Sequence, residues 1–138
     1  SSTSCVAGGG YKDGSNHTQA FVSVYNGRTW ADHKVAGSLN VGNEGFVNSV
    51  SCASSTSCVA GGVYTDRNHL SRAFVSVYNG STWADQEAAT LLNVGKVGEV
   101  GSVSCTSSGR CVAGGQYADA SSNFQAFLSS ATLPVAHA

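Results

Sequence analysis

Polar and apolar residues alternate along several short segments of the chain, and this alternation predicts β-strands rather than helices. Residues 47–52 read Val-Asn-Ser-Val-Ser-Cys, in which apolar and polar residues alternate as in a half-buried strand. Asn79-Gly80 is a strong signal for a hairpin turn. The pattern predicts four antiparallel strands and the first strand of a next unit, at residues 47–52, 58–64, 73–78, 81–85 and 100–105.

These strands belong to an internal repeat. The string Cys-Val-Ala-Gly-Gly begins at Cys5, Cys58 and Cys111, at a constant spacing of 53 residues. Residues 1–53 and 54–106 are identical at 34 of 53 positions, and a third copy begins at residue 107 and is incomplete. The spacing favours a repeated four-stranded unit.

A four-stranded unit of this length is typical of a β-propeller blade, whose known repeats span roughly 40–50 residues. We therefore expect an all-β fold with about 2.5 blades in the chain. The domain assignment is a single propeller segment over residues 1–138, with blade repeats 1–53, 54–106 and a partial repeat 107–138.

Composition narrows the range of functions. Charged residues make up 11% of the chain, and 7 Lys and Arg stand against 8 Asp and Glu, for a net charge of -1. Such a chain has no basic stripe for phosphates, so nucleic acid is not an expected partner. No apolar run reaches the roughly 20 residues of a membrane-spanning helix. The chain begins at Ser1 and contains no Met, which favours a processed or trimmed product.

Residues 76–83 read Ser-Val-Tyr-Asn-Gly-Ser-Thr-Trp, and a closely related string occupies residues 23–30. The strings resemble the Asp-box of sialidase-type β-propellers, S-x-D-x-G-x-T-W, although Tyr25 and Tyr78 stand where that family has Asp. The whole unit also resembles repeats of secreted bacterial propellers. The resemblance implies a fold-stabilising turn that faces away from any active centre. We expect Trp30 and Trp83, at the ends of the strings, to pack over their hairpins rather than to stack on a sugar.

The cysteines suggest two disulfides. Cys52 and Cys58 end one predicted strand and begin the next, as do Cys105 and Cys111, and a hairpin would bring each pair together. A metal site is less favoured, because no His lies close to these cysteines in sequence. Cys5 is left over, and three explanations stay open: a free thiol, a bridge to another chain, or loss of its partner by truncation. Disulfides imply an oxidising compartment, and we expect a secreted, extracellular protein.

The strand count predicts association. The repeats supply three strands of a first blade, four of a second and three of a third, with a further strand possible at residues 133–138. Such an arc leaves apolar faces open at both ends. Two chains would supply about five to six blades and three chains about eight, so a homodimer is the first expectation. In that dimer, residues 133–138 would replace the missing strand of the partner's first blade.

Candidate ligand-binding residues lie where propeller geometry gathers two sets of loops at one end. They are polar or aromatic residues that recur between the repeats: Tyr11, Asp13, Asn40, Tyr64, Asp66, Asn93, Tyr117 and Asp119. Their side chains suit sugar hydroxyls. Asp and Asn in such segments are also ordinary turn formers, and that structural explanation stays open. No catalytic residue, cofactor or metal is expected.

The function favoured by these features is multivalent carbohydrate binding, by analogy with propeller lectins. One alternative is a secreted adhesion or scaffold module, or a fragment of a larger propeller. A sialidase-like glycoside hydrolase is the least supported class. Such an enzyme needs a cluster of arginines for the substrate carboxylate, and the four arginines of this chain occupy non-equivalent blade positions: Arg28, Arg67, Arg72 and Arg110. We therefore expect a binding protein and not an enzyme.

Overall fold

The computed structural model describes residues 4–92 and 94–134, which form strands and the loops between them. The ten strands are β1 (Cys5–Lys12), β2 (Thr18–Tyr25), β3 (Trp30–Lys34), β4 (Gly45–Ser54), β5 (Ser57–Thr65), β6 (Ser71–Tyr78), β7 (Trp83–Glu87), β8 (Gly98–Cys105), β9 (Arg110–Ala118) and β10 (Phe124–Thr132). In this part of the chain no helix is long and apolar enough to cross a membrane.

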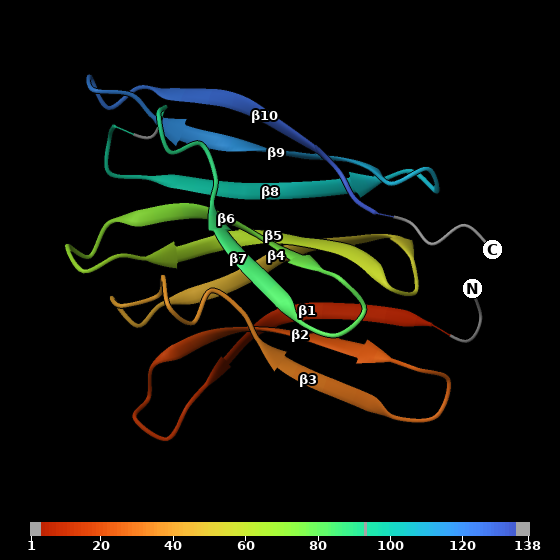
Figure 1. Ribbon diagram of the computed structural model, residues 1–138. Helices are drawn as coiled ribbons and strands as arrows, with labels where there is room; N and C mark the ends of the chain where they lie inside the picture. The colour runs from red at the N-terminus through yellow and green to blue at the C-terminus, as the bar shows by residue number, and fades with distance from the viewer. Residues whose placement is uncertain (1–3, 93, 135–138) are drawn as a thin grey trace.

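The strands form three antiparallel sheets, which lie one beside the next in the order of the repeats (Figure 1). The first sheet has the order β1-β2-β3, the second β4-β5-β6-β7 and the third β8-β9-β10. The predicted all-β class is thereby confirmed, and the sheets follow the 53-residue period. β4 and β8, which end the first and second copies of the repeat, each join the sheet of the next copy. The sheets form an open stack within the chain.

The predicted strands agree closely with the observed ones, except for the fourth strand of the second repeat. That strand was expected at residues 81–85, whereas β7 begins at Trp83. The expectation was wrong because Ser81 and Thr82 belong to the turn: their N–H groups donate to Asn79 Oδ1 at 3.0 and 2.9 Å. Gly80 completes the turn with a φ of +93°, which a residue without a Cβ adopts at little cost.

Each hairpin that resembles the Asp-box carries a Tyr–Trp pair. The rings of Tyr78 and Trp83 stack with 5.0 Å between centroids, and those of Tyr25 and Trp30 lie 5.2 Å apart. Tyr78 and Trp83 also face each other across the β6–β7 register. Tyr25 and Tyr78 therefore contact the tryptophans across their hairpins through their rings.

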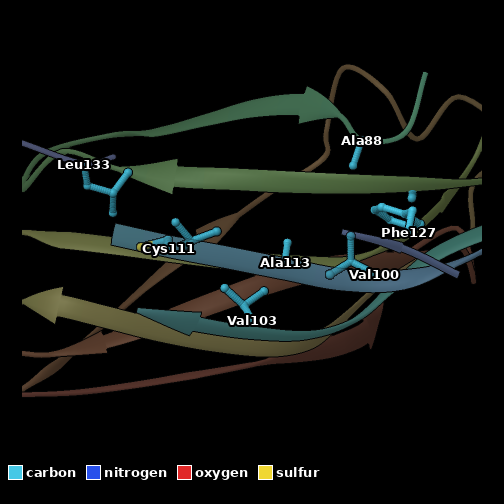
Figure 2. Packing of buried hydrophobic residues seen from close by; sticks show 9 residues of the cluster. Ala88, Val100, Val103, Cys111, Ala113, Phe127 and Leu133 are labelled. Atoms are coloured by element: carbon cyan, nitrogen blue, oxygen red, sulfur yellow. The ribbon is translucent and has the colours of Figure 1, made fainter. Parts of the chain in front are cut away.

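Two apolar clusters hold the sheets together, because the two sides of the second sheet face different neighbours. Ala60, Tyr64 and Phe74 pack with Val22 of β2, between the first and second sheets. Alternate residues of the same strands point to the third sheet, and the second cluster is made of Val59, Ala73, Ala88, Val100, Val103, Cys111, Ala113, Phe127 and Leu133 (Figure 2). The strands of the second sheet are thus covered on both sides.

Both predicted disulfides are present. Cys52 is bonded to Cys58 across the β4–β5 hairpin, and Cys105 is bonded to Cys111 across the β8–β9 hairpin. Cys5 is a free, exposed thiol. Two disulfides in a chain of this size indicate an oxidising environment.

The chain after β10 continues along its own core. Leu133 is buried, and its N–H donates to the Gly109 carbonyl at 2.7 Å. The Pro134 carbonyl accepts a hydrogen bond from the Ser57 hydroxyl. Leu133 and Pro134 lie outside the strands, and the rest of the segment expected at 133–138 lies outside the described residues.

Candidate functional site

The loops predicted to carry a ligand site are gathered at one end of the sheets. The connection between β3 and β4 contacts the end of β5 there. Gly42 N–H donates to the Thr65 carbonyl at 2.7 Å, and Thr65 N–H donates to the Glu44 carbonyl at 2.8 Å. Thr18 and Glu44 form a further bridge, between the start of β2 and the segment that leads into β4. Loops of two repeats therefore share this end of the molecule.

The three predicted aspartates occupy equivalent positions in three hairpin loops, and each closes its own loop. Asp13 Oδ1 accepts from the N–H groups of Ser15 and His17, at 2.9 and 3.0 Å. Its Oδ2 accepts from Gln19 Nε2 at 2.8 Å. Asp119 does the same with the N–H groups of Ser121 and Asn123 and with Gln125 Nε2, at 2.9, 3.0 and 3.1 Å.

Asp66 follows this pattern with a charged partner. Its Oδ1 accepts from the N–H groups of Asn68 and Leu70, and its Oδ2 lies 3.0 Å from Arg72 Nε. Burial opposes ionisation of Asp66, but the Leu70 N–H and the Arg72 side chain outweigh it and lower the pKa of the carboxyl. Both oxygens serve the loop.

Hydrogen bonds also lower the pKa values of the other two carboxyls. For Asp13 the largest contribution comes from the Gln19 side chain, and for Asp119 it comes from the Asn123 N–H. All three groups are stabilised as carboxylates by partners within their own hairpins. Their observed contacts are those of turn-forming residues.

The three predicted tyrosines differ in exposure. Tyr64 is 3% exposed, Tyr117 is half-buried and Tyr11 is 42% exposed. Burial, with the nearby Glu87 carboxylate as the next cause, raises the pKa of Tyr64 to about 12. Of the three, Tyr11 lines a cleft of about 360 Å³ on the outer face of the first sheet, together with Phe21, Asp32, His33 and Lys34.

Asn40 is buried and joins the first two repeats. Its Nδ2 donates to the Thr18 carbonyl at 3.1 Å and to Gln19 Oε1 at 3.2 Å, and its Oδ1 accepts from Thr65 N–H at 3.3 Å. Its counterpart Asn93 lies outside the described residues. Asn40 therefore links Thr18 of the first sheet to Thr65 of the second sheet.

A groove of about 200 Å³ lies over that junction. Its lining consists of Thr18, Glu44, Gly45, Phe46, Val63, Thr65 and Ser71. The Phe46 ring is 47% exposed and rests over Gly10, where a Cβ would come within 2.7 Å of the ring. The groove thus combines one exposed aromatic ring, one exposed carboxylate and three residues with hydroxyls, of which Thr18 and Thr65 are buried and Ser71 is half-buried.

The third sheet has a cleft of its own, which shares three repeat positions with the groove. Glu99, Gln116 and Phe124, which line it, stand 53 residues after Phe46, Val63 and Ser71. Its volume is about 460 Å³, Phe124 is 60% exposed, and Gln116 Nε2 donates to Glu99 Oε1 at 2.8 Å. Each cleft again has an exposed aromatic ring and a carboxylate, from different positions of the repeat.

Sequence reasoning missed Glu44 and Phe46. The predicted residues are ones that recur at a spacing of 53 residues. Glu44 and Phe46 do not recur, because Val97 and Glu99 stand at the equivalent positions. The signal that points to them is the opposite one: an acidic residue and an aromatic residue that break the repeat just before a predicted strand.

Within residues 4–92 and 94–134, no group of three His, Cys, Asp or Glu side chains is placed to hold a metal ion.

Comparison of the chain with known protein families and with curated proteins finds no match.

Proposed function

We propose that the three sheets are successive blades of a β-propeller arc and that the protein is a secreted carbohydrate-binding module. The observation that carries the proposal is the groove between the first and second sheets. An apolar ring face next to hydroxyls and a carboxylate is the arrangement that accommodates the C–H face and the hydroxyls of one sugar ring.

Several features support this assignment. Phe46 is held by strand β4 and by the close approach to Gly10, so little side-chain freedom is lost when a sugar stacks on it. Glu44 is exposed beside it and would accept two sugar hydroxyls. The comparable cleft of the third sheet would add a second weak site, and two sites on one rigid body favour multivalent surfaces.

Binding without catalysis is the proposed role. Hydrolysis of a glycoside generally needs two carboxyl groups flanking the scissile bond. The groove, the cleft of the third sheet and the cleft at Tyr11 each have one carboxyl group among their lining residues. These groups belong to Glu44, Glu99 and Asp32, in that order. The arrangement suits recognition of a sugar rather than cleavage.

The test is a glycan array probed with the labelled, non-reduced protein, with free monosaccharide as competitor. The wild-type protein is expected to give a competed signal on a related set of glycans. Phe46→Ala should lower that signal about tenfold, because one stacking contact and its preorganised face are lost. Leu91→Ala, at a side chain that is 93% exposed and outside the groove, is the matched control.

Two results would contradict the proposal in different ways. A blank array from protein with native circular dichroism would remove carbohydrate binding. A competed signal that Phe46→Ala leaves unchanged would keep carbohydrate binding but exclude the groove as its site.

We further propose that two chains associate and complete a ring of about five to six blades. The support is that exposed residues of the first and third sheets stand at repeat positions that are covered by a neighbouring sheet in the second sheet. Tyr11 and Phe21 on the first sheet correspond to Tyr64 and Phe74, which are buried against a preceding sheet. Leu128 on the third sheet is 80% exposed and corresponds to Val75, which packs against the following sheet.

Light scattering at micromolar concentration tests the association. The expected mass is that of a dimer, and Leu128→Asp should reduce it to the monomer because the charge would enter the apolar contact. Leu91→Asp is the control. A monomeric wild-type protein would rule the dimer out and would favour the alternative, an adhesion or scaffold module whose open faces bind another protein.

A further inference from the structure

Strand β1 has one free edge, whereas its counterpart in the next repeat has none. β1 pairs with β2 alone, while β5 lies between β4 and β6. Cys58 and Ala60 of β5 are fully buried, and the corresponding Cys5 and Ala7 are exposed. Within the described residues, one side of the β1 backbone therefore presents N–H and C=O groups without a neighbouring strand.

A cleft of about 430 Å³ runs along this edge. Ser4, Cys5 and Val6 form one wall, and residues 50–55, at the end of β4 and in the following turn, form the other. In the second repeat the equivalent space, between β5 and β8, is filled by β4 itself, which contacts both. The repeat thus shows what kind of segment fits such a cleft.

Gly9 preserves the space that such a segment would need. At Gly62 a Cβ would lie 1.9 Å from the Phe46 carbonyl oxygen of β4, and at Gly115 it would lie 1.9 Å from the Glu99 carbonyl oxygen of β8. In both cases the glycine admits the backbone of the neighbouring first strand. At Gly9 the nearest atom is Cε1 of the Phe21 ring, at 3.2 Å, so the place of that backbone is open.

The β4 wall also carries a set of hydrogen-bonding positions for a preceding strand. Between the second and third sheets, Ser49 Oγ accepts from Val103 N–H at 3.0 Å and Ser51 Oγ accepts from Cys105 N–H at 2.9 Å. Val50 and Cys52 stand at the same places one repeat earlier. In the described part of the chain, no hydroxyl fulfils this role for their N–H groups.

Cys5 completes the correspondence. Cys58, its counterpart, is bonded to Cys52 at the end of β4. A strand that entered the cleft in the register of β4 would bring a cysteine opposite Cys5, whose thiol is free and exposed. The edge, the cleft, the open space at Gly9 and the thiol thus agree on one register.

We propose that the free edge of β1 is an acceptor site for one extended peptide segment with the pattern of β4, apolar-x-Ser-apolar-Ser-Cys, which becomes linked to Cys5. The segment adds a strand by backbone hydrogen bonds and places its two serine hydroxyls on the N–H groups of Val50 and Cys52. The cleft at Cys5 is distinct from the proposed carbohydrate groove, since residues 4–6 and 50–55 lie at the opposite ends of the strands from Thr18 and Glu44.

The covalent step is a thiol–disulfide exchange. The Cys5 thiolate attacks the cysteine sulfur of a segment that carries a small thiol, such as glutathione, in a mixed disulfide. The Cys5–segment disulfide forms, the mixed disulfide breaks, and the small thiol leaves with the electron pair. One equivalent of small thiol is released for each adduct.

The experiment uses a synthetic peptide with the sequence of residues 43–54 as its glutathione mixed disulfide, and the intact, non-reduced protein. Mass spectrometry should show one peptide per chain, attached to Cys5, with one equivalent of glutathione released. A scrambled peptide with the same cysteine should react at least about tenfold more slowly, because it lacks the strand register that concentrates the two sulfurs. Cys5→Ser should give no adduct.

A glycine pair separates binding from simple thiol reactivity. Gly9→Ala has room for its methyl group beside the flexible ring of Phe21, but that methyl would meet the carbonyl of the incoming strand. It should abolish the preference for the β4 peptide and leave the reaction of Cys5 with oxidised glutathione unchanged. Gly14→Ala, where a Cβ would meet nothing within 4 Å, is the matched control and should behave as the wild type.

Three results would overturn the proposal. One is equal rates for the β4 peptide and the scrambled peptide. Another is an undiminished preference in Gly9→Ala. The third is a protein whose Cys5 is protected from all peptides in a dimer and reacts on dilution without preference, which would assign the cleft to a second copy of the chain.

Discussion

The first and second repeats are identical at 34 of 53 positions, yet equivalent side chains lie in different surroundings. Phe74 is fully buried between two sheets, whereas Phe21 is half-buried on an open face. Tyr64 is 3% exposed and Tyr11 is 42% exposed. The strands are alike because their local sequence is alike, but burial depends on the neighbouring sheet. Comparison of equivalent residues in the two repeats therefore shows the effect of the neighbouring sheet on burial, at similar local sequence.

The largest expected difference is between two phenylalanine truncations. Phe74→Ala should lower the free energy of unfolding by about 3–5 kcal/mol, since it leaves a cavity in a closed core. In dilute solution, where the proposed dimer is dissociated, Phe21→Ala should lower it by about 1–2 kcal/mol, because the face of Phe21 is partly in water in the single chain. Urea unfolding followed by circular dichroism measures both. Equal losses would show that a further sheet covers Phe21 in solution.

The cysteines should give the next largest difference. Replacing Cys52 and Cys58 together by Ala removes the disulfide across the β4–β5 hairpin and should cost about 2 kcal/mol in the loop-entropy model. Cys5→Ala should change stability by less than about 0.5 kcal/mol, because an exposed thiol without a disulfide contributes little. Thermal unfolding in non-reducing buffer compares them. A large loss of stability in Cys5→Ala would indicate that Cys5 forms a disulfide in the protein in solution.

The smallest expected effect concerns acid stability. The pKa of Asp66 is lowered in the folded protein, so its contribution is complete above the unfolded value near 3.8 and is lost as the pH falls through the lower folded value. Asp66→Asn should flatten the acid limb of a stability profile measured by urea unfolding between pH 7 and 3. Glu44→Gln, at an exposed carboxyl outside the hairpin loops, is the control. An unchanged acid limb in Asp66→Asn would assign the acid sensitivity to other groups.

Much of the fold could be predicted from the sequence because its determinants are local. Alternation of apolar and polar residues marks several of the strands, and the spacing of Cys52 and Cys58 is short enough for a hairpin to close. The start of β7 was misjudged because the side chain of Asn79 accepts two N–H groups and extends the turn. A side-chain hydrogen bond of this kind is not visible in a hydrophobic pattern.

The candidate site was less predictable, because the same residue types serve turns and ligands. Asp13, Asp66 and Asp119 recur in the repeat, but the structure gives both oxygens of each carboxylate to its own loop. Glu44 and Phe46 were overlooked because they do not recur. Residues that maintain a repeated fold must recur, whereas residues that define one groove need not. The distinction between the two groups emerges only when contacts are known.

The seam between the second and third sheets has a consequence for how such a chain grows by gene duplication. One strand contributes the hydroxyls of Ser49 and Ser51, and the next contributes the N–H groups of Val103 and Cys105. Both complete copies encode both halves, since Ser102 and Ser104 repeat the hydroxyls and Val50 and Cys52 repeat the backbone positions. A newly duplicated unit would therefore join either end of the array without any compensating mutation, and selection would be free to alter the grooves first.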